Sequence, residues 1–470
     1  MRITRYVGPD GCDDPQYQAE LTTAGGAVID TVSPQRNVTI EARLDDHPLR
    51  FEFSDELRDF IDVAAAVYVG DELEQRATQG NTWTREFQHT VPVSDPALWA
   101  RGDVSLRRTL HFLAGDRFTF RWLQRAALPA GRQSRTLLPD GFDAVCLFSG
   151  GMDSLLGAHL LLSQGRKVLL VGHQAEGITA AAQKTLAAEL RLLYPDCLTL
   201  MQCRVARSQG DAPLYPLPEK VEETHRPRSF LFLALAIAVA RATGIDEVFL
   251  PENGLIALNP PLQKNRVGTL STRTAHPIYV SRLLEFLHTT GLFTGTIRNP
   301  FLYQSKTDML QSSPTALREI MVRSVSCSRP SRYQDRGVRH CGYCVPCIYR
   351  RAAMMAAGLD EASEYAFDFL TELPGMTRHT QADVRAVAAF AQRVIQASDM
   401  ELQLLVLAHG YFPADLGGRI GPSPTTDYTP WAQMLRRWAQ SFVAETQPRC
   451  TAEVWDMLAL PALVIRSSVV

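Results

Sequence analysis

The chain has 470 residues, which is too many for one ordinary hydrophobic core and leads us to expect two or three domains. A hydrophobic content of 46%, a charged content of 21% and a net charge of −2 are those of a soluble globular protein, and they exclude a general electrostatic field for nucleic acids or membranes. The longest apolar run, Phe230–Ala240, is too short to span a bilayer, and the N-terminus lacks the apolar core of a signal peptide. We therefore expect a cytoplasmic protein that binds no membrane.

The first 138 residues are predicted to form an accessory domain of the α+β type. Strand-like runs span Val38–Leu44, Thr82–Val91 and Arg117–Trp122, and Ser54–Leu73 has the composition of a helix with Ser54 as its N-cap. The sequence of this region contains no catalytic constellation. We therefore interpret it as a docking or lid module.

Residues 139–373 are predicted to form an α/β domain with a parallel sheet. Strand-like runs alternate here with helical stretches, which is typical of parallel sheets that bind ligands at the carboxyl ends of their strands. The predicted strands are Ala144–Phe148, Lys167–Gly172, Cys197–Gln202 and Glu247–Leu250, and the predicted helices are Ala180–Leu193 and Ser229–Thr243. Residues 374–470 are predicted to be a helical C-terminal region, with helices over Gln381–Ala397 and Pro430–Thr446.

The polar stretch SGGMDS (residues 149–154) lies at the turn between the first predicted strand of the α/β domain and a helix. Such a turn directs backbone N–H groups and the positive end of the helix toward one point, which suits an anion. Its amino-acid sequence does not match the motifs of a Walker loop, a dinucleotide-binding fingerprint or a nucleophile elbow. Asp153 would repel a bound phosphate unless a cation lay between them, so the stretch implies Mg²⁺. The alternative is a tight turn in which Gly150 and Gly151 only supply unusual backbone angles.

Four of the nine cysteines have the spacing of a metal site. Cys341, Cys344 and Cys347 are separated by two residues each, and Cys327 lies fourteen positions before Cys341. Thiolates at this spacing converge on one tetrahedral ion, and four of them saturate Zn²⁺, so we predict a structural zinc site. The alternatives are a redox pair, which needs only two cysteines, and a site in which His340 replaces Cys327 as the fourth ligand.

SGGMDS, followed by the cysteine cluster and Arg350, resembles the 7-cyano-7-deazaguanine synthase (QueC-like) family of the ATP pyrophosphatase (PP-loop) superfamily. The stretches RPRSFLFLALAIAVA (226–240), PENGLIALNPP (251–261) and NPFLYQSKTDML (299–310) also match the family pattern. The resemblance covers about half of the chain. It implies a PP-loop fold and an ATP-dependent ligase that adenylates a carboxylate on a 7-deazaguanine base, lets an amine attack, and releases AMP and pyrophosphate.

The resemblance also implies roles for individual residues. Lys306 is expected to stabilise charge at the α-phosphate, Asn253 to read a base edge, and Arg228 to contact a phosphate or the carboxylate. The alternatives for these three are a surface lysine, a turn residue and a solvated charge. The expected catalytic residues are Asp153, Ser154 and Lys306, and the expected contacts to ATP or substrate are Ser149, Gly150, Gly151, His173, Gln174, Arg228, Glu252 and Asn253, with His173 and Gln174 near adenine.

The regions before and after the α/β domain resemble extensions found in the longer, anti-phage-defence-associated (Qat or type IV CBASS-like) members. This implies a partner protein from the same operon whose N-terminus serves as the amine, so that an amide forms where ammonia would give a nitrile. Two other functions remain alternatives, namely a tRNA-thiolating PP-loop enzyme, which the near-neutral charge disfavours, and a nucleotide-sensing scaffold without chemistry. A homodimer is left open, and direct binding of nucleic acid is not expected.

Overall fold

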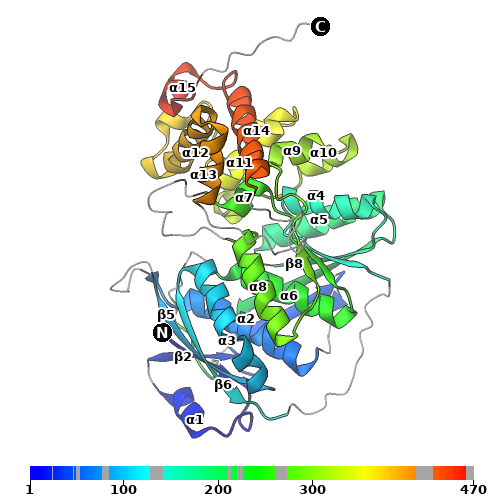
Figure 1. Ribbon diagram of the computed structural model, residues 1–470, viewed down its shortest axis with the longest axis vertical. Coiled ribbons are helices and arrows are strands. Elements are labelled where there is room, and N and C mark those ends of the chain that lie inside the picture. The colour runs from blue at the N-terminus through cyan, green and yellow to red at the C-terminus, as the bar shows by residue number, and fades with distance from the viewer. Residues whose placement is uncertain are drawn as a thin grey trace.

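The computed structural model contains two β-sheets and a group of C-terminal helices, with the smaller sheet at the bottom of Figure 1 and the C-terminal helices at the top. It describes residues 1–23, 25–45, 47–48, 53–76, 84–127, 141–174, 176–208, 213–219, 222, 226–260, 262, 273–408 and 427–461. The predicted α/β class is confirmed. None of the helices in these ranges combines the length and the apolar composition that crossing a membrane requires.

The smaller sheet belongs to the first 138 residues and has the strand order β2-β1-β5-β6. All neighbouring strands in it are parallel, so each connection has to cross over the sheet, and helices serve as crossovers. The elements of this part are β1 (Arg2–Tyr6), α1 (Pro15–Thr22), β2 (Gly26–Asp30), α2 (Asp55–Leu73), β5 (Glu86–Val93), α3 (Pro96–Ala114) and β6 (Arg117–Gln124).

The strand predicted over Val38–Leu44 is present with these bounds, and the helix and the other two strands predicted in this region are present with shifted ends. Ser54 holds the N-cap position of α2, but its side chain makes no capping hydrogen bond. The strand predicted from Thr82 begins at Glu86, and residues 82 and 83 lie outside the described ranges. The strand predicted from Arg117 continues to Gln124.

The larger sheet has the order β11-β10-β7-β8-β9-β3-β4. The neighbours from β11 to β9 are parallel, which confirms the predicted parallel sheet and its four predicted strands. β3 (Val38–Leu44) pairs antiparallel with β9, so the first 138 residues contribute to both sheets. The other strands are β4 (His47–Pro48), β7 (Ala144–Leu147), β8 (Val168–His173), β9 (Leu198–Arg207), β10 (Glu247–Phe249) and β11 (Thr296–Arg298).

Helices connect these strands and continue into the C-terminal region. Those of the central part are α4 (Met152–Ser163), α5 (Gly177–Leu193), α6 (Arg228–Thr243), α7 (Gly254–Leu258), α8 (Pro277–Thr290), α9 (Lys306–Gln311), α10 (Thr315–Met321), η3 (Pro330–Arg336), α11 (Val345–Ala356), η4 (Ala362–Glu364) and η5 (Leu373–Gly375). Those of the C-terminal region are α12 (Arg378–Gln396), α13 (Asp399–Leu407), α14 (Thr429–Thr446) and α15 (Ala452–Leu458), which confirms the two helices predicted there.

One hydrophobic core runs through all three parts of the chain. The ring of Phe60 on α2 lies 6.0 Å, between centroids, from that of Phe230 on α6. On the other side, Tyr349 of α11 packs edge-on against Trp438 of α14 at 5.6 Å. Because these contacts join helices of different regions, the N-terminal and C-terminal regions are both packed onto helices of the central part.

Candidate active site and metal centre

The SGGMDS stretch forms a tight loop between β7 and α4. Gly150 has a φ of +83°, and a Cβ at this position would lie 3.1 Å from Thr179 O and from Gln183 N on α5. Position 150 therefore favours glycine both for its backbone angle and for the space available. Gly151 is the N-cap of α4, so the first amides of the helix follow it directly.

The two serine hydroxyls of the loop hold its backbone. Ser149 Oγ accepts a hydrogen bond from Gly151 N at 3.3 Å, and Ser154 Oγ donates one to Gly151 O at 3.0 Å. The two hydroxyl oxygens lie 3.2 Å apart. The loop is thus a compact turn at a helix N-terminus, which is the geometry of an anion-binding site.

Asp153 lies in the first turn of α4 and is buried, with 5% exposure. Its Oδ1 forms a buried ion pair with Lys306 Nζ, and its Oδ2 accepts hydrogen bonds from Asn253 N at 3.0 Å and Asn253 Nδ2 at 2.6 Å. Asp153 is therefore a buried residue and does not lie on the protein surface. Because the Lys306 ammonium already offsets its charge, Asp153 by itself does not require Mg²⁺.

Glu252 places a second carboxyl group beside Asp153. It is half-buried and follows the end of β10. Burial and the negative charge of Asp153 raise the pKa of Glu252 to about 8, and the positive charge of Lys306 acts in the opposite direction. Neighbouring carboxyl groups are the oxygen donors that Mg²⁺ prefers, so Asp153 and Glu252 fit the ion that the loop sequence implied.

Glu252 is expected to make the protein less stable as the pH rises from 5 to 8. Its carboxyl group keeps a proton in the folded state up to about pH 8, whereas its ordinary pKa is 4.5, so the stabilisation is complete at low pH and is lost as the pH rises through the folded pKa. Thermal unfolding without divalent cations measures this effect. Glu252→Gln, which stays neutral, should show a smaller fall in melting temperature over this range, and identical pH profiles would contradict the assignment.

Two residues that were not among the predicted site residues, Asn299 and Gly157, shape the segment that carries Glu252. Asn299 Nδ2 donates to Glu252 O at 2.8 Å, and Asn299 Oδ1 accepts from Glu252 N at 3.3 Å. Gly157 allows α4 to approach this segment, since a Cβ there would lie 2.3 Å from Pro251 Cβ. Asn299 opens the NPFLYQSKTDML stretch, so the family pattern contained a signal for it. Gly157, a single glycine within a helical pattern, gave none.

Asn253 is fully buried, and its polar atoms are bonded within the protein. Its Oδ1 accepts from Ile256 N at 3.2 Å as the N-cap of α7, while its amide groups donate to Asp153. These bonds orient the Asp153 carboxylate. They give no support to the expected contact with a base edge.

Lys306 is the first residue of α9, and two sets of hydrogen bonds fix the segment around it. Ser305 and Asp308 form a capping box around the start of this helix. Arg437 of α14 donates to Tyr303 O at 3.0 Å and to Asp308 Oδ2 at 3.3 Å. The C-terminal region therefore fixes the segment that carries Lys306.

His173 and Gln174 lie at the carboxyl end of β8, next to the loop. Gln183 Nε2 donates to His173 O at 3.1 Å and lies 3.4 Å from Ser149 O, so this buried side chain ties the end of β8 to the loop. Arg228, the first residue of α6, is half-buried, and its guanidinium lies 5.8 Å from the centroid of the Phe232 ring. No hydrogen bond or ion pair links Arg228 to the SGGMDS loop in the described part of the chain.

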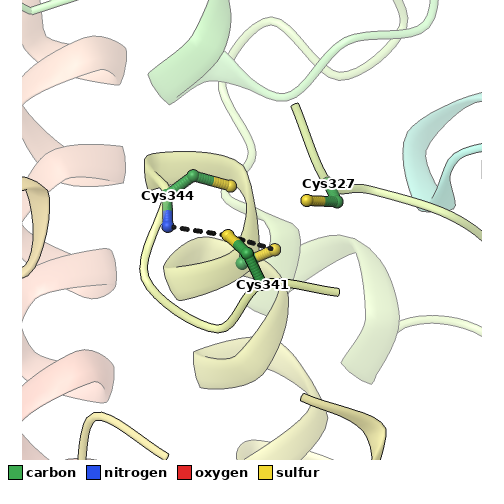
Figure 2. Close-up of side chains that lie close together, drawn as sticks. Cys327, Cys341 and Cys344 are labelled. Atoms are coloured by element: carbon green, nitrogen blue, oxygen red, sulfur yellow. Dashed lines mark hydrogen bonds between the residues drawn. The ribbon is translucent and has the colours of Figure 1, made fainter. Parts of the chain in front are cut away.

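The four predicted zinc ligands come together. The sulfur atoms of Cys327, Cys341, Cys344 and Cys347 all lie within 4.8 Å of one another. Figure 2 shows the side chains of Cys341 and Cys344, which belong to one loop, close to that of Cys327 on another segment, and Cys344 N donates to Cys341 Sγ at 3.3 Å. A set of four sulfur donors fits a structural Zn²⁺ ion. His340 lies outside the set, because its Nε2 accepts a hydrogen bond from Ser326 N at 3.3 Å.

The cysteine cluster is connected to the SGGMDS loop through a short segment. Val325, two residues before Cys327, donates its backbone N–H to Gly150 O at 2.9 Å. Arg350 of α11 donates to Ser324 Oγ at 2.6 Å on the same segment. A displacement of Cys327 would therefore disturb the backbone of the loop.

About half of the chain is similar to proteins named 7-cyano-7-deazaguanine synthase. The one from Novosphingobium aromaticivorans is 28% identical over 243 residues, which are 49% of this chain and 98% of that protein. Those from Rhizorhabdus wittichii and Syntrophobacter fumaroxidans are 26% and 24% identical, and each match covers 48% of this chain and 97% of the relative. No protein-family model matches the chain, and no solved structure matches it significantly. The resemblance recognised in the sequence is thus confirmed, while the link to defence systems stays a prediction.

Proposed function

We propose that this chain, about half of which is related to the 7-cyano-7-deazaguanine synthases, uses ATP to activate a carboxylate on a 7-deazaguanine-type base and transfers the acyl group to an amine. The main support for the proposal is that three segments, which are far apart in the sequence, lie together in the structure. The SGGMDS loop supplies an anion-binding turn, and Lys306 and Glu252 arrive beside Asp153 from distant parts of the sequence. A phosphate turn without a Walker lysine, but with a buried lysine nearby, suits chemistry at the α-phosphate.

In the proposed first step, a substrate carboxylate oxygen attacks the α-phosphorus of ATP, and the bond to the oxygen bridging the α- and β-phosphates breaks. The amides around Gly150 and Gly151 would bind the departing pyrophosphate. Lys306 would turn from Asp153 to the α-phosphate and stabilise the charge that develops there. Asp153 and Glu252 would hold Mg²⁺, which supplies charge neutralisation on the phosphates.

In the proposed second step, the amine attacks the acyl carbon, and AMP leaves with one oxygen of the original carboxylate. The protein then has to exclude water from the activated acid, because water would return the substrate unchanged. The cysteine cluster would hold Zn²⁺ with no open coordination position, so its part is to support the fold.

We propose further that the amine belongs to a partner protein. The relatives match half of this chain with nearly their whole length, so the other half has no counterpart in them. These additional regions share the hydrophobic core of the central part and would offer surface for a macromolecular acceptor. An acceptor N-terminus would give an amide.

Cleavage of ATP should yield equal amounts of AMP and pyrophosphate when the protein is incubated with MgATP, 7-carboxy-7-deazaguanine and an ammonium salt, which stands in for the amine of the partner protein. The reaction should depend on the acid, because the acid is the nucleophile. Anion-exchange chromatography separates these products from ADP and phosphate. ADP as the only nucleotide product would contradict the proposal. Binding of ATP without any cleavage would favour a nucleotide-sensing scaffold.

A further inference from the structure

Helix α14 of the C-terminal region packs against the two short helices that begin next to Asp153. These are α7, which follows Asn253, and α9, which begins with Lys306 (Figure 1). Asn253 and Lys306 bind different oxygens of the Asp153 carboxylate. α14 is therefore a common support for the two groups that hold Asp153. It lies outside the stretches that resemble the synthase family, so the resemblance implies no role for it.

On the α9 side, the contact with α14 is made by Arg437 and Trp431. The Arg437 guanidinium donates to Tyr303 O at 3.0 Å and to Asp308 Oδ2 at 3.3 Å, so it joins residues on both sides of Lys306. The Trp431 ring packs edge-on against the Tyr303 ring, with 5.3 Å between the centroids. The main chain at Lys306 is thus held, and movement of its ammonium is left to the torsions of the side chain.

On the α7 side, α14 contacts Gly254, the first residue of the helix. Gly254 N donates to Gln304 O at 2.8 Å, so α7 and the segment before α9 are also bonded to each other. A Cβ on Gly254 would lie 2.9 Å from Met434 Cε of α14 and 2.4 Å from Leu302 O. The three segments are tightly packed at this point, and a shift of α14 would therefore disturb the start of both helices.

We propose that Arg437 is a positioning residue, through which α14 holds Lys306 where its ammonium can pass from Asp153 to the α-phosphate. This inference rests on the proposed function, in which Lys306 stabilises charge that develops in the transition state. A loosened lysine would slow the chemical step far more than it would weaken substrate binding, because the stabilisation acts in the transition state. An ion pair with a structural role alone would leave the rate of this step unchanged.

Arg437→Gln removes the charge and keeps most of the length of the side chain. We expect kcat for acid-dependent AMP formation to fall about 10- to 100-fold, with KM for ATP and for the acid within about threefold of the wild-type values. The melting temperature should stay within about 3 °C, because Arg437 is 48% exposed and exposed ion pairs contribute little to stability. Arg437→Lys keeps the charge and loses the fork of donors, so it should recover about a third of the wild-type kcat.

Arg436→Gln is the matched control on the same helix. The Arg436 guanidinium donates to Ala397 O and to Asp399 Oδ1, each at 2.8 Å, so its ion pair lies within the C-terminal region. The same change of side chain at this position should leave kcat within about twofold of the wild-type value.

The reactivity of the Lys306 amine gives a second readout, which needs no turnover. This amine is buried and paired with Asp153, whereas Lys167 is exposed and serves as the internal reference. Acetylation with acetic anhydride, followed by mass spectrometry, measures the ratio of the two rates. Arg437→Gln should raise the ratio of Lys306 to Lys167 at least about threefold, because the segment opens more often, and Arg436→Gln should leave it unchanged.

Unchanged kcat in Arg437→Gln, with AMP formation intact in the wild type, would overturn the inference and leave the proposed function standing. A rise of KM without a fall of kcat would place Arg437 in substrate binding and would also overturn it, as would equal losses of kcat in Arg437→Gln and Arg436→Gln. A wild-type protein that forms no AMP, combined with a raised acetylation ratio in Arg437→Gln, would refute the proposed function and leave the hold of α14 on Lys306 in place. No AMP and an unchanged ratio would refute both.

Discussion

Replacement of Asp153 by asparagine is expected to reduce acid-dependent AMP formation by at least about 10³-fold. The variant keeps the shape of the side chain and loses its charge. Without that charge, the site can neither hold Mg²⁺ nor keep Lys306 in its ion pair. AMP formation is measured at saturating ATP and acid. Full turnover in this variant would show that Asp153 is only a structural residue of the first turn of α4.

The same change is expected to destabilise the fold, because Lys306 is 6% exposed and would be left without its partner. Breaking a buried ion pair by removing one charge costs about 3–5 kcal/mol. Asp153→Asn/Lys306→Met, which removes both charges, is the matched control. It should recover most of the unfolding free energy and remain inactive, and this separates loss of chemistry from loss of folding. Equal stability of the single variant and the wild type would contradict the buried ion pair.

Loss of one cysteine of the cluster is expected to have the largest effect on folding. Cys344→Ala removes a ligand from a set of four sulfurs that lie within 4.8 Å of one another, and structural zinc contributes on the order of 10 kcal/mol to folding in small zinc domains. The variant should be insoluble or poorly folded. The wild-type protein should contain about one Zn²⁺ per chain by metal analysis.

Cys450→Ala is the control for this experiment, since Cys450 is half-buried and lies outside the cluster. It should retain zinc and fold normally. A Cys344→Ala protein that is soluble, cooperative in thermal unfolding and free of zinc would contradict a structural metal site. The backbone N–H of Val325, two residues before Cys327, donates a hydrogen bond to Gly150 O. Partial loss of zinc should therefore also weaken the binding of a non-hydrolysable ATP analogue.

Local patterns were sufficient to predict the strands β7, β8, β9 and β10 of the larger sheet, the glycine turn and the cysteine cluster. A buried strand followed by Gly150 and Gly151 is encoded within a dozen residues, and Cys341, Cys344 and Cys347 follow one another at the start of α11, with Cys344 as its N-cap and Cys347 in its first turn. Each of these features depends on neighbours in the chain. Such features can be recognised in the sequence as a short motif or as a regular spacing of residues.

The contacts around Asp153 could not be predicted in the same way, because they join segments far apart in the sequence. Lys306 reaches Asp153 across 153 positions, and Asn253 reaches it across 100. The family pattern named these residues but did not show that Lys306 neutralises Asp153, and so Mg²⁺ was inferred for the wrong reason. The antiparallel pairing of β3 with β9 and the approach of Gly157 to Pro251 are likewise long-range features. No local signal distinguishes them.

The central claim, attack of a carboxylate on the α-phosphate, is tested most directly by following oxygen. The protein is incubated with MgATP, an amine and 7-carboxy-7-deazaguanine in which both carboxylate oxygens are ¹⁸O. The AMP that forms is examined by mass spectrometry. Direct attack predicts that each AMP carries one ¹⁸O atom, because the bond that breaks in the second step joins the acyl carbon to that oxygen. Unlabelled AMP would mean that water attacked ATP, and it would contradict the proposed reaction.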